Sequence, residues 1–314
     1  MAFTPNMTTT TSIDDSIVQE YEAEFIVQYN QTNVVDAACE YMADIGAKSI
    51  EFPRYSLLAT AETPLGEDTD ADSDEMVDSK VIFTPKEYGK SVTRTELADL
   101  QTGGRGTRGA MRLIGINMGE TTNVLGTRAL EASTNVKYGG DATGLADLDA
   151  ADVMTPTLLN AIYNKLARAN VPVHSATGTY IAYMHDDVIH DLREGSSAGS
   201  WEDVNKYNNE VPVLQNEVGM FKGFRIIRNN HCLLTSDGAG VASPQTLDAY
   251  TSSFLGFNGV GKAESAMPQI RVTGPFDKLG RFLNIGWYGV LEYKIVETNA
   301  VWNAVTSSSI GVNV

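Results

Sequence analysis

The longest regular pattern in the chain runs from Thr107 to Thr134 and predicts a helix of unusual length. Apolar residues recur there at steps of three, four and seven, which places them in one stripe on a 3.6-residue period. The stripe consists of Met111, Ile114, Met118, Leu125 and Ala129. At about 1.5 Å per residue such a helix is about 40 Å long. It is therefore expected to act as a strut in an extended molecule, not as one layer of a compact enzyme.

Three glycines accompany this stripe at Gly115, Gly119 and Gly126. A glycine inside a helix costs about 1 kcal/mol relative to alanine, so three of them need a compensating contact. We expect that another part of the backbone packs closely along this line of the helix.

Composition narrows the class of protein. A chain of 314 residues can bury a sizeable core in one or two domains. Its formal net charge of -17 disfavours a general affinity for nucleic acid or for anionic membranes, because phosphate binding needs a basic surface. Cys39 and Cys232 are far apart and belong to no metal-binding motif, so buried, reduced thiols and folding in the cytoplasm are expected. No apolar run reaches the length of a membrane span, and the first residues do not resemble a signal peptide.

The N-terminal region is expected to be an arm followed by two helices. Residues 1–12 are small, polar and rich in threonine, which is typical of a mobile arm. Ile13–Tyr29 carries apolar and aromatic residues four apart, and this pattern fits equally a helix that docks on another subunit and a helix of the protein's own core. A second helix is expected at Val34–Ile45, ended by Gly46.

Two extended segments, Lys48–Thr60 and Lys80–Thr95, are rich in β-branched and aromatic residues, and each contains a proline. Proline confines a strand to an edge or a bulge, so the two segments are expected to pair as the arms of an exposed hairpin. The loop between them, Glu62–Asp78, carries eight acidic residues and no basic one, and it is expected to be solvated. A two-stranded ribbon is marginally stable alone, so a partner is expected to support it.

The remainder of the chain alternates helices and strands, which gives an α+β class. Helices are expected at Met154–Ala169, with Thr155 as N-cap and Pro156 in the first turn, and at Asp186–Glu194, ended by Gly195. Strands are expected at Gly178–Met184, Ser253–Phe257, Arg281–Val296 and Ala300–Val305, and a hairpin at Val218–Arg228. Turn-rich or irregular structure is expected at Gly139–Asp152, Leu233–Pro244 and Ser265–Val272.

The acidic loop partly resembles a calcium-binding loop. Asp70, Asp72 and Asp74 match its first three ligand positions, but Glu75 stands where the loop needs glycine and Val81 where it needs an acid. A solvated acidic tip accounts for the pattern better, and binding of a divalent ion remains the alternative.

The densest group of chemically capable side chains is His185, Asp186, Asp187, His190 and Asp191. A zinc-protease helix needs histidines four apart, whereas these are five apart and lie on different helix faces. Asp187 and His190 are placed to pair across one turn. Acidic residues at a helix start are favoured by capping and by the helix dipole, so a structural role is preferred to metal or acid–base chemistry.

A glycine-rich stretch, Gly103–Gly109, precedes the long helix and resembles a phosphate-binding loop. Its spacing matches neither GxxxxGK[ST] nor GxGxxG, so a flexible hinge is the preferred interpretation. Arg105, Arg108 and Arg112 are available there to an acidic partner.

A projecting hairpin with an acidic tip, a long glycine-notched helix, a mixed α/β region and C-terminal aromatic strands occur in that order. The order resembles the major capsid proteins of tailed bacteriophages, which share the Hong Kong 97-like fold. Two stretches carry a more specific resemblance, YIAYMHDDVIHDLREG at Tyr180–Gly195 and VGMFKGFRIIRNN at Val218–Asn230. They are similar to the axial-domain sequences of one phage capsid subfamily.

The resemblance implies a division of the chain into four regions. These are an N-terminal arm (1–46), an extended loop or E-loop (47–96), a peripheral domain with the spine helix (97–150 and 271–314) and an axial domain (151–270).

The resemblance also implies a function. Many copies would assemble through hexamers and pentamers into an icosahedral shell around double-stranded DNA, with no sequence-specific DNA contact and no membrane. Scaffolding, portal and decoration proteins are the implied partners, and the protein would assemble in the bacterial cytoplasm and reside in the virion. No catalytic, cofactor-binding or metal-binding residue is assigned. The alternatives are an encapsulin-like compartment enclosing a protein cargo and, from another class, a hydrolase using His185, Asp187 and His190.

Overall fold

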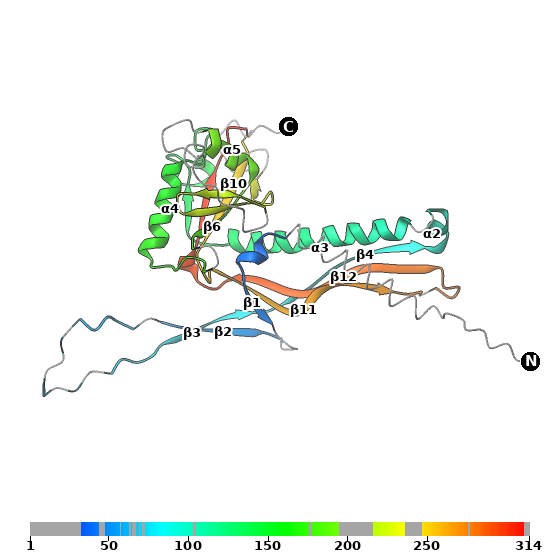
Figure 1. The fold of residues 1–314 in the computed structure, drawn as a ribbon, viewed down its shortest axis with the longest axis horizontal. Coiled ribbons are helices and arrows are strands. Elements are labelled where there is room, and N and C mark those ends of the chain that lie inside the picture. Colours follow the sequence, from blue (N-terminus) through cyan, green and yellow to red (C-terminus); the bar gives the residue numbers. More distant parts are fainter. Residues whose placement is uncertain are drawn as a thin grey trace, which may run out of the picture.

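The computed structural model describes residues 33–310, apart from 44–47, 57, 63, 65–66, 69, 71–72, 103–104, 176–177, 195–215, 236–246 and 276. The expected arm (1–12) and the helix at Ile13–Tyr29 lie outside the described residues, as do Gly46 and Gly195. The described part is a mixed α+β structure with three sheets. Figure 1 shows a globular end, a long flat arm of helix on sheet, and a thin ribbon that reaches past the globular end.

The long helix is present as α3 (Arg105–Glu131), close to the predicted Thr107–Thr134. Met111, Ile114 and Met118 are buried as expected, and Ile114 and Met118 pack on Trp287 of the sheet beneath. Further along, Leu130 is buried while the predicted Leu125 and Ala129 are only half-buried. The buried face of α3 therefore changes along the helix, at the point where α3 leaves the sheet of the flat arm and reaches the globular end. No helix in the described part of the chain is long and apolar enough to cross a membrane.

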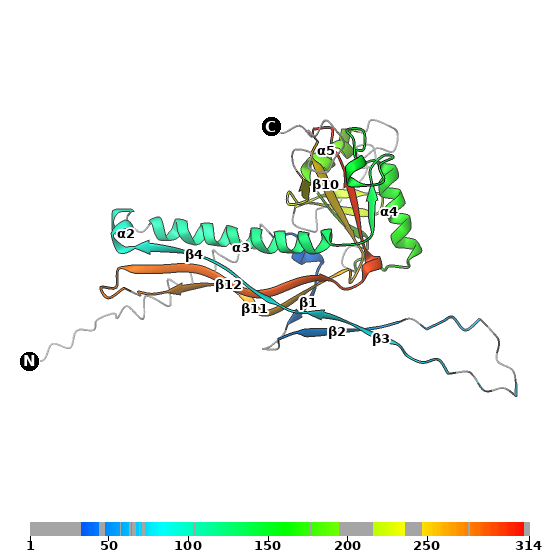
Figure 2. The ribbon, with the colours of Figure 1, turned by 180° about the vertical axis from the view of Figure 1, so that it is seen from behind.

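A four-stranded sheet lies under α3 along most of its length (Figure 2). Its strands, in spatial order, are β1 (Glu40–Ala43), β11 (Val260–Thr273), β12 (Phe282–Ile295) and β4 (Lys86–Thr95). β11 and β12 run antiparallel over almost their full length and form the backbone of the flat arm. The Trp287 indole N–H donates to Asn117 Oδ1 of α3 at 3.0 Å, which fixes the helix along the sheet.

A seven-stranded mixed sheet forms the globular end. Its strands, in spatial order, are β5 (Val136–Tyr138), β13 (Val301–Thr306), β10 (Ala249–Leu255), β6 (Tyr180–Met184), β8 (Phe224–Arg228) and β7 (Glu217–Phe221), and β9 (Leu233–Thr235) pairs with β10. The predicted strand at Gly178–Met184 and the hairpin at Val218–Arg228 are confirmed.

Strand β6 is buried on both faces and separates two apolar cores. Tyr180, Ala182 and Met184 face the core covered by α4 (Pro156–Arg168) and α5 (Asp186–Glu194). Ile181 and Tyr183 face the second core, which includes Leu130 of α3. Helix α4 begins as predicted, with the Thr155 hydroxyl accepting from the Leu158 amide at 3.3 Å.

Polar side chains fix the C-terminal half of α3 on the globular end. The Asn123 amide donates to Asn229 Oδ1 at 3.0 Å, and the Asn229 amide donates to Thr127 Oγ1 at 2.8 Å. Asn303 of β13 donates to the Leu130 carbonyl at 3.0 Å. Buried hydrogen bonds of this kind are satisfied in only one arrangement, so they specify how the helix lies against the sheet.

The predicted helix at Val34–Ile45 is wrong. The segment forms one 3-10 turn, η1 (Val35–Ala38), and then β1, which pairs in parallel with β11. One turn is enough to bury Val35 and Ala38 completely, because both point into the second core. The segment that follows pairs its backbone groups with the edge of β11. Helix propensity is a local property and cannot predict a contact with a strand so distant in sequence.

The predicted pairing of Lys48–Thr60 with the whole of Lys80–Thr95 is also wrong. The ribbon consists of β2 (Ile50–Tyr55) and β3 (Asp78–Phe83), paired from Ile50–Phe83 to Tyr55–Asp78. After Thr84 and Pro85 the chain enters β4, which pairs with β12 instead. Pro53 does lie on an edge strand, as its missing amide requires.

Three further local predictions need correction. Helix α2 (Glu96–Thr102) was not predicted, although Thr95 caps it by accepting from the Ala98 amide. The expected hinge at Gly103–Gly109 is instead helical from Arg105 onward, and Gly103 and Gly104 lie outside the description. The segment expected to be irregular at Ser265–Val272 belongs to the long strand β11, which carries register shifts near Ala266. Those shifts interrupt the alternation of side chains that would reveal a strand.

Close packing occurs at Gly126 of α3, but the atoms that approach it belong to side chains and not to the stretch of backbone expected from the sequence. A Cβ atom placed there would lie 2.8 Å from Val35 Cγ1 and 3.6 Å from the Tyr293 ring. Gly115 and Gly119 are also buried. Gly109, near the helix start, has open space around the equivalent position.

We predict that Gly126→Ala lowers the free energy of unfolding by about 1–3 kcal/mol, because Val35 is fully buried and cannot move away. Gly109→Ala is the matched control and should raise it by up to about 1 kcal/mol through helix propensity alone. Urea unfolding of unassembled subunits measures both. Equal stability of the two variants would mean that α3 has no close-packed contact at Gly126.

Candidate functional site

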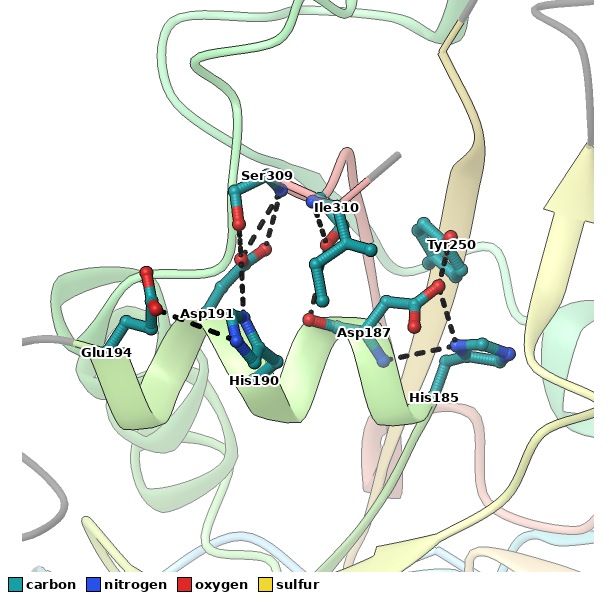
Figure 3. Close-up of polar contacts among 9 residues, drawn as sticks. His185, Asp187, His190, Asp191, Glu194, Tyr250, Ser309 and Ile310 are labelled. Carbon is teal, nitrogen blue, oxygen red and sulfur yellow. Dashed lines mark hydrogen bonds and ion pairs between the residues drawn. The ribbon is translucent and has the colours of Figure 1, made fainter. Parts of the chain in front are cut away.

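The first half of the histidine cluster centres on Asp187, at the start of α5. His185 Nδ1 lies 3.3 Å from Asp187 Oδ2 and also accepts from the Asp187 amide at 3.3 Å (Figure 3). The Tyr250 hydroxyl of β10 donates to the same Asp187 Oδ2 at 2.5 Å. Burial, and then this hydrogen bond to a carboxylate, raise the pKa of Tyr250 above its usual value. The phenol therefore stays protonated and acts as a fixed donor.

The second half lies one turn further along α5. His190 Nε2 is 3.6 Å from Glu194 Oε1, and its Nδ1 is 3.9 Å from Asp191 Oδ1. Asp191, whose side chain is only 4% exposed, accepts from the amide and the hydroxyl of Ser309 (Figure 3). Ser308 also donates to the Asp187 carbonyl at 3.2 Å.

These contacts give the cluster a structural role. The Asp187 carboxylate accepts from Tyr250 and lies beside His185, while His190 lies near Asp191 and Glu194, so the predicted pairing of Asp187 with His190 is wrong. The hydroxyl of Ser309 donates to a carboxylate and not to an imidazole, so it is not activated as a nucleophile. The carboxylates of α5 instead hold β10 and the C-terminal segment against the helix.

The described residues do not bring together the other two candidate sites derived from the sequence. In that part of the chain no three His, Cys, Asp or Glu side chains gather at metal-binding distance. The described acidic residues of the 62–78 loop are exposed, and Asp72 lies outside the description. Arg108 and Arg112 are exposed on the first turns of α3. A helical turn replaces the phosphate-binding loop that was considered for that stretch.

The ribbon has apolar side chains but no core of its own beyond its base. Phe83 is buried at the base, where it packs with Val296 and Ala263. Farther out, Tyr55, Leu58, Met76 and Val77 are exposed. Both views show the ribbon leaving the body in the direction opposite to α2 (Figures 1 and 2). Such side chains indicate a surface that another molecule covers.

A second exposed apolar surface lies at the far end of the flat arm, around α2. Leu97 and Leu100 of α2, Leu113 of α3 and Leu279 of the β11–β12 turn are exposed, with Leu100 at 73%. Sequence reasoning missed this surface because it missed α2. The available signal was Thr95 followed by acidic residues in a first helical turn, with leucines that have no apolar partner nearby.

Comparison with known proteins relates part of the chain to a family. A search of curated proteins finds no match. The sequence profile of the family described as phage capsid protein matches residues 124–277. Over these residues, just under half of its length, the chain is similar to phage capsid proteins. A capsid protein is a structural component of a virion and not an enzyme, so this similarity argues against the hydrolase alternative.

The capsid fold is also found in solved structures. The structure titled "Capsid of Ralstonia phage GP4" superposes with a TM-score of 0.71 at 14% identity, over 88% of this chain and 92% of that one. The cyanophage Pam1 capsid gives 0.65 at 14% identity, over 86% and 89%. A virus-like particle from Pyrococcus furiosus gives 0.56 at 11% identity, over 92% and 99%. The Hong Kong 97-like fold inferred from the sequence is thereby confirmed.

We predict that replacing His185 and His190 together by asparagine changes the free energy of unfolding by at most about 1 kcal/mol. Asparagine keeps an acceptor at the helix start, and His190 is half exposed. Asp191→Ala is the contrast and should cost about 1–3 kcal/mol, since the buried carboxylate loses its contacts with Ser309. Thermal unfolding ranks the variants. A double variant less stable than Asp191→Ala would contradict this assignment of roles.

Proposed function

We propose that many copies of this chain form the icosahedral shell of a tailed bacteriophage, built from hexamers and pentamers around double-stranded DNA. The observation that carries the proposal is the outer part of the ribbon. β2 and β3 form backbone pairs only with each other among the described strands, and they contact the body through Phe83 and through the ion pair of Arg54 with Glu297. The loop beyond them exposes apolar side chains that the described part of the chain leaves uncovered. Because an extended two-stranded projection is marginal in water, a neighbouring subunit supplies the support of this outer part.

The two ends of the molecule are complementary in charge. The ribbon loop is acidic, while Arg108 and Arg112 are exposed on the first turns of α3, and α2 and the start of α3 lie at the end opposite to the ribbon (Figure 1). Contact between unlike ends is heterologous, and such contacts close into rings when the rotation between subunits allows it. Rings of five and six are the units that an icosahedral shell requires.

We retain the four regions implied by the resemblance, with boundaries adjusted to the strand pairing. The arm (1–46) and the E-loop (47–96) come first, but β4 at the end of the E-loop range pairs within the peripheral sheet. Most of β11 lies before residue 271, yet it belongs to that same peripheral sheet. β13, assigned with 271–314 to the peripheral domain, pairs with β10 and favours the axial domain (151–270).

The acidity of the chain suits a container for DNA. A net charge of -17 gives the shell a low affinity for DNA phosphates, so the genome is packaged and released without strong contacts to the inner surface of the shell. Scaffolding, portal and decoration proteins are the proposed further partners.

The encapsulin-like compartment is the alternative, because one structure with this fold is described as a virus-like particle. Size-exclusion chromatography and negative-stain imaging of the protein expressed in bacteria test both. Shells or capsomers support the proposal, and small closed shells filled with host protein favour the alternative. A monomer at all concentrations would overturn both.

We predict that replacing residues 57–76 by Asn-Gly leaves a folded subunit that fails to form shells. Ser56 already donates to the Val77 carbonyl at 3.0 Å, so a two-residue turn closes the ribbon without disturbing β2 or β3. The melting temperature of the unassembled subunit should stay within a few degrees of the parent, and electron microscopy scores the shells.

A control variant of unchanged length separates the effect of the length of the loop from the effect of its charge. In that variant the acidic residues of the loop become their amides, so the apolar contacts and the length remain. Shells should form from it, with less dependence on salt. A large drop in subunit melting after the loop replacement would mean that the loop belongs to the subunit fold, against the proposal.

A further inference from the structure

A lysine and two carboxylates meet where η1 and β1 join the four-stranded sheet. Lys262 Nζ of β11 lies 2.7 Å from Asp36 Oδ2 of η1 and 2.5 Å from Glu264 Oε1 of β11. The Tyr293 hydroxyl of β12 donates to the other oxygen of Asp36, Oδ1, at 2.6 Å. Four side chains from three elements therefore converge on one lysine–carboxylate pair.

Water has little access to this group. The side chain of Lys262 is 7% exposed and that of Glu264 is 3% exposed, while Asp36 reaches the surface with 26%. Burying three ionised groups costs several kcal/mol per ion, and one lysine cannot neutralise two carboxylates. Condensation of the lysine with Asp36 removes two of these three ions, and Glu264, left without its counter-ion, then takes up a proton from water.

We propose that Lys262 and Asp36 condense to an isopeptide bond within one chain, with Glu264 carrying the protons. The Lys262 nitrogen attacks Cγ of Asp36, which lies at most about 3.9 Å away because Oδ2 is bonded to it at about 1.2 Å. The N–Cγ bond forms, and the Cγ–Oδ2 bond breaks. This geometry is close to that of productive intramolecular reactions, which gain their rate from fixed proximity.

The atoms and charges balance without any other reactant. The ammonium loses two protons, both of which reach Oδ2, and Oδ2 leaves as water. Glu264 accepts each proton from the nitrogen and passes it on, since its Oε1 and Asp36 Oδ2 contact the same nitrogen. Glu264 ends the condensation in the state in which it began, and the exposed side of Asp36 gives the water a way out.

Tyr293 has the position of an oxyanion donor. Its hydroxyl already contacts Oδ1, the atom on which negative charge develops in the tetrahedral intermediate. The Cys39 thiol interacts electrostatically with both Asp36 and Lys262 and could compete as a nucleophile, but burial and then Asp36 raise its pKa, so it stays protonated. The amine is therefore the group that reacts.

The bond would join the end of the N-terminal arm to the long strand β11. A covalent link between residues so distant in sequence lowers the conformational entropy of the unfolded chain, as a disulfide does. Unlike a disulfide, it does not need an oxidising compartment. A subunit linked in this way would resist unfolding under forces that pull on its arm.

The test is the intact mass of the denatured full-length chain, followed by peptide mapping. We expect the mass to be lower than that of the sequence by one water molecule. Tandem mass spectrometry should find the peptide containing Asp36 joined to the peptide containing Lys262. Lys262→Arg and Glu264→Gln should each restore the full mass, and Tyr293→Phe should slow the loss of water in freshly made protein.

Mapping also separates this reaction from cyclisation of Asp36 onto its own backbone, which loses the same mass but leaves Lys262 open to trypsin. Wild-type protein of full mass, or water loss with a cleavable Lys262, overturns the proposal. The wild-type measurement decides the matter even if a variant fails to fold, and it is independent of whether shells form.

Discussion

The close packing of α3 on the rest of the chain is the contact on which the other parts of this structure depend. Its first half lies on the four-stranded sheet through Ile114, Met118 and Trp287, and its second half reaches the globular end through Leu130. Gly126 is the point at which η1 meets the helix, and only a residue without a side chain fits there. One helix thus connects both sheets and the start of the described chain.

The two halves of α3 are held by different physical means. The first half is held mainly by apolar packing on a flat sheet, which is non-directional, with the hydrogen bond from Trp287 to Asn117 as a directional contact. The hydrogen bonds among Asn123, Thr127 and Asn229 are directional and are satisfied in one arrangement only. The flat arm can therefore bend against the helix more readily than the globular end can turn on it.

The sequence was sufficient wherever a local pattern determined the structure. The long helix, α4 with its Thr155 cap, the buried strand β6 and the β7–β8 hairpin follow from periodicity and capping within a few residues. Most failures involve distant partners, whereas α2 was missed although Thr95 caps it locally. Val34–Ile45 became a turn and a strand because β11 offers an edge, and β4 left the ribbon because β12 pairs with it. The acidic loop was predicted from composition, whereas the meeting of Asp36 with Lys262 required the fold.

The order of the strands has a consequence for synthesis of the protein. β12 is an inner strand of the four-stranded sheet, and β13 is an inner strand of the seven-stranded one. Each of them is synthesised after the strands that it pairs with, so the four-stranded sheet is incomplete until β12 has been made and the seven-stranded sheet until β13 has been made. The ribbon and the long helix, although made much earlier, therefore have no completed sheets to pack on before that point. A chain that stops short of β12 leaves both sheets divided, and one that stops between β12 and β13 leaves the seven-stranded sheet divided.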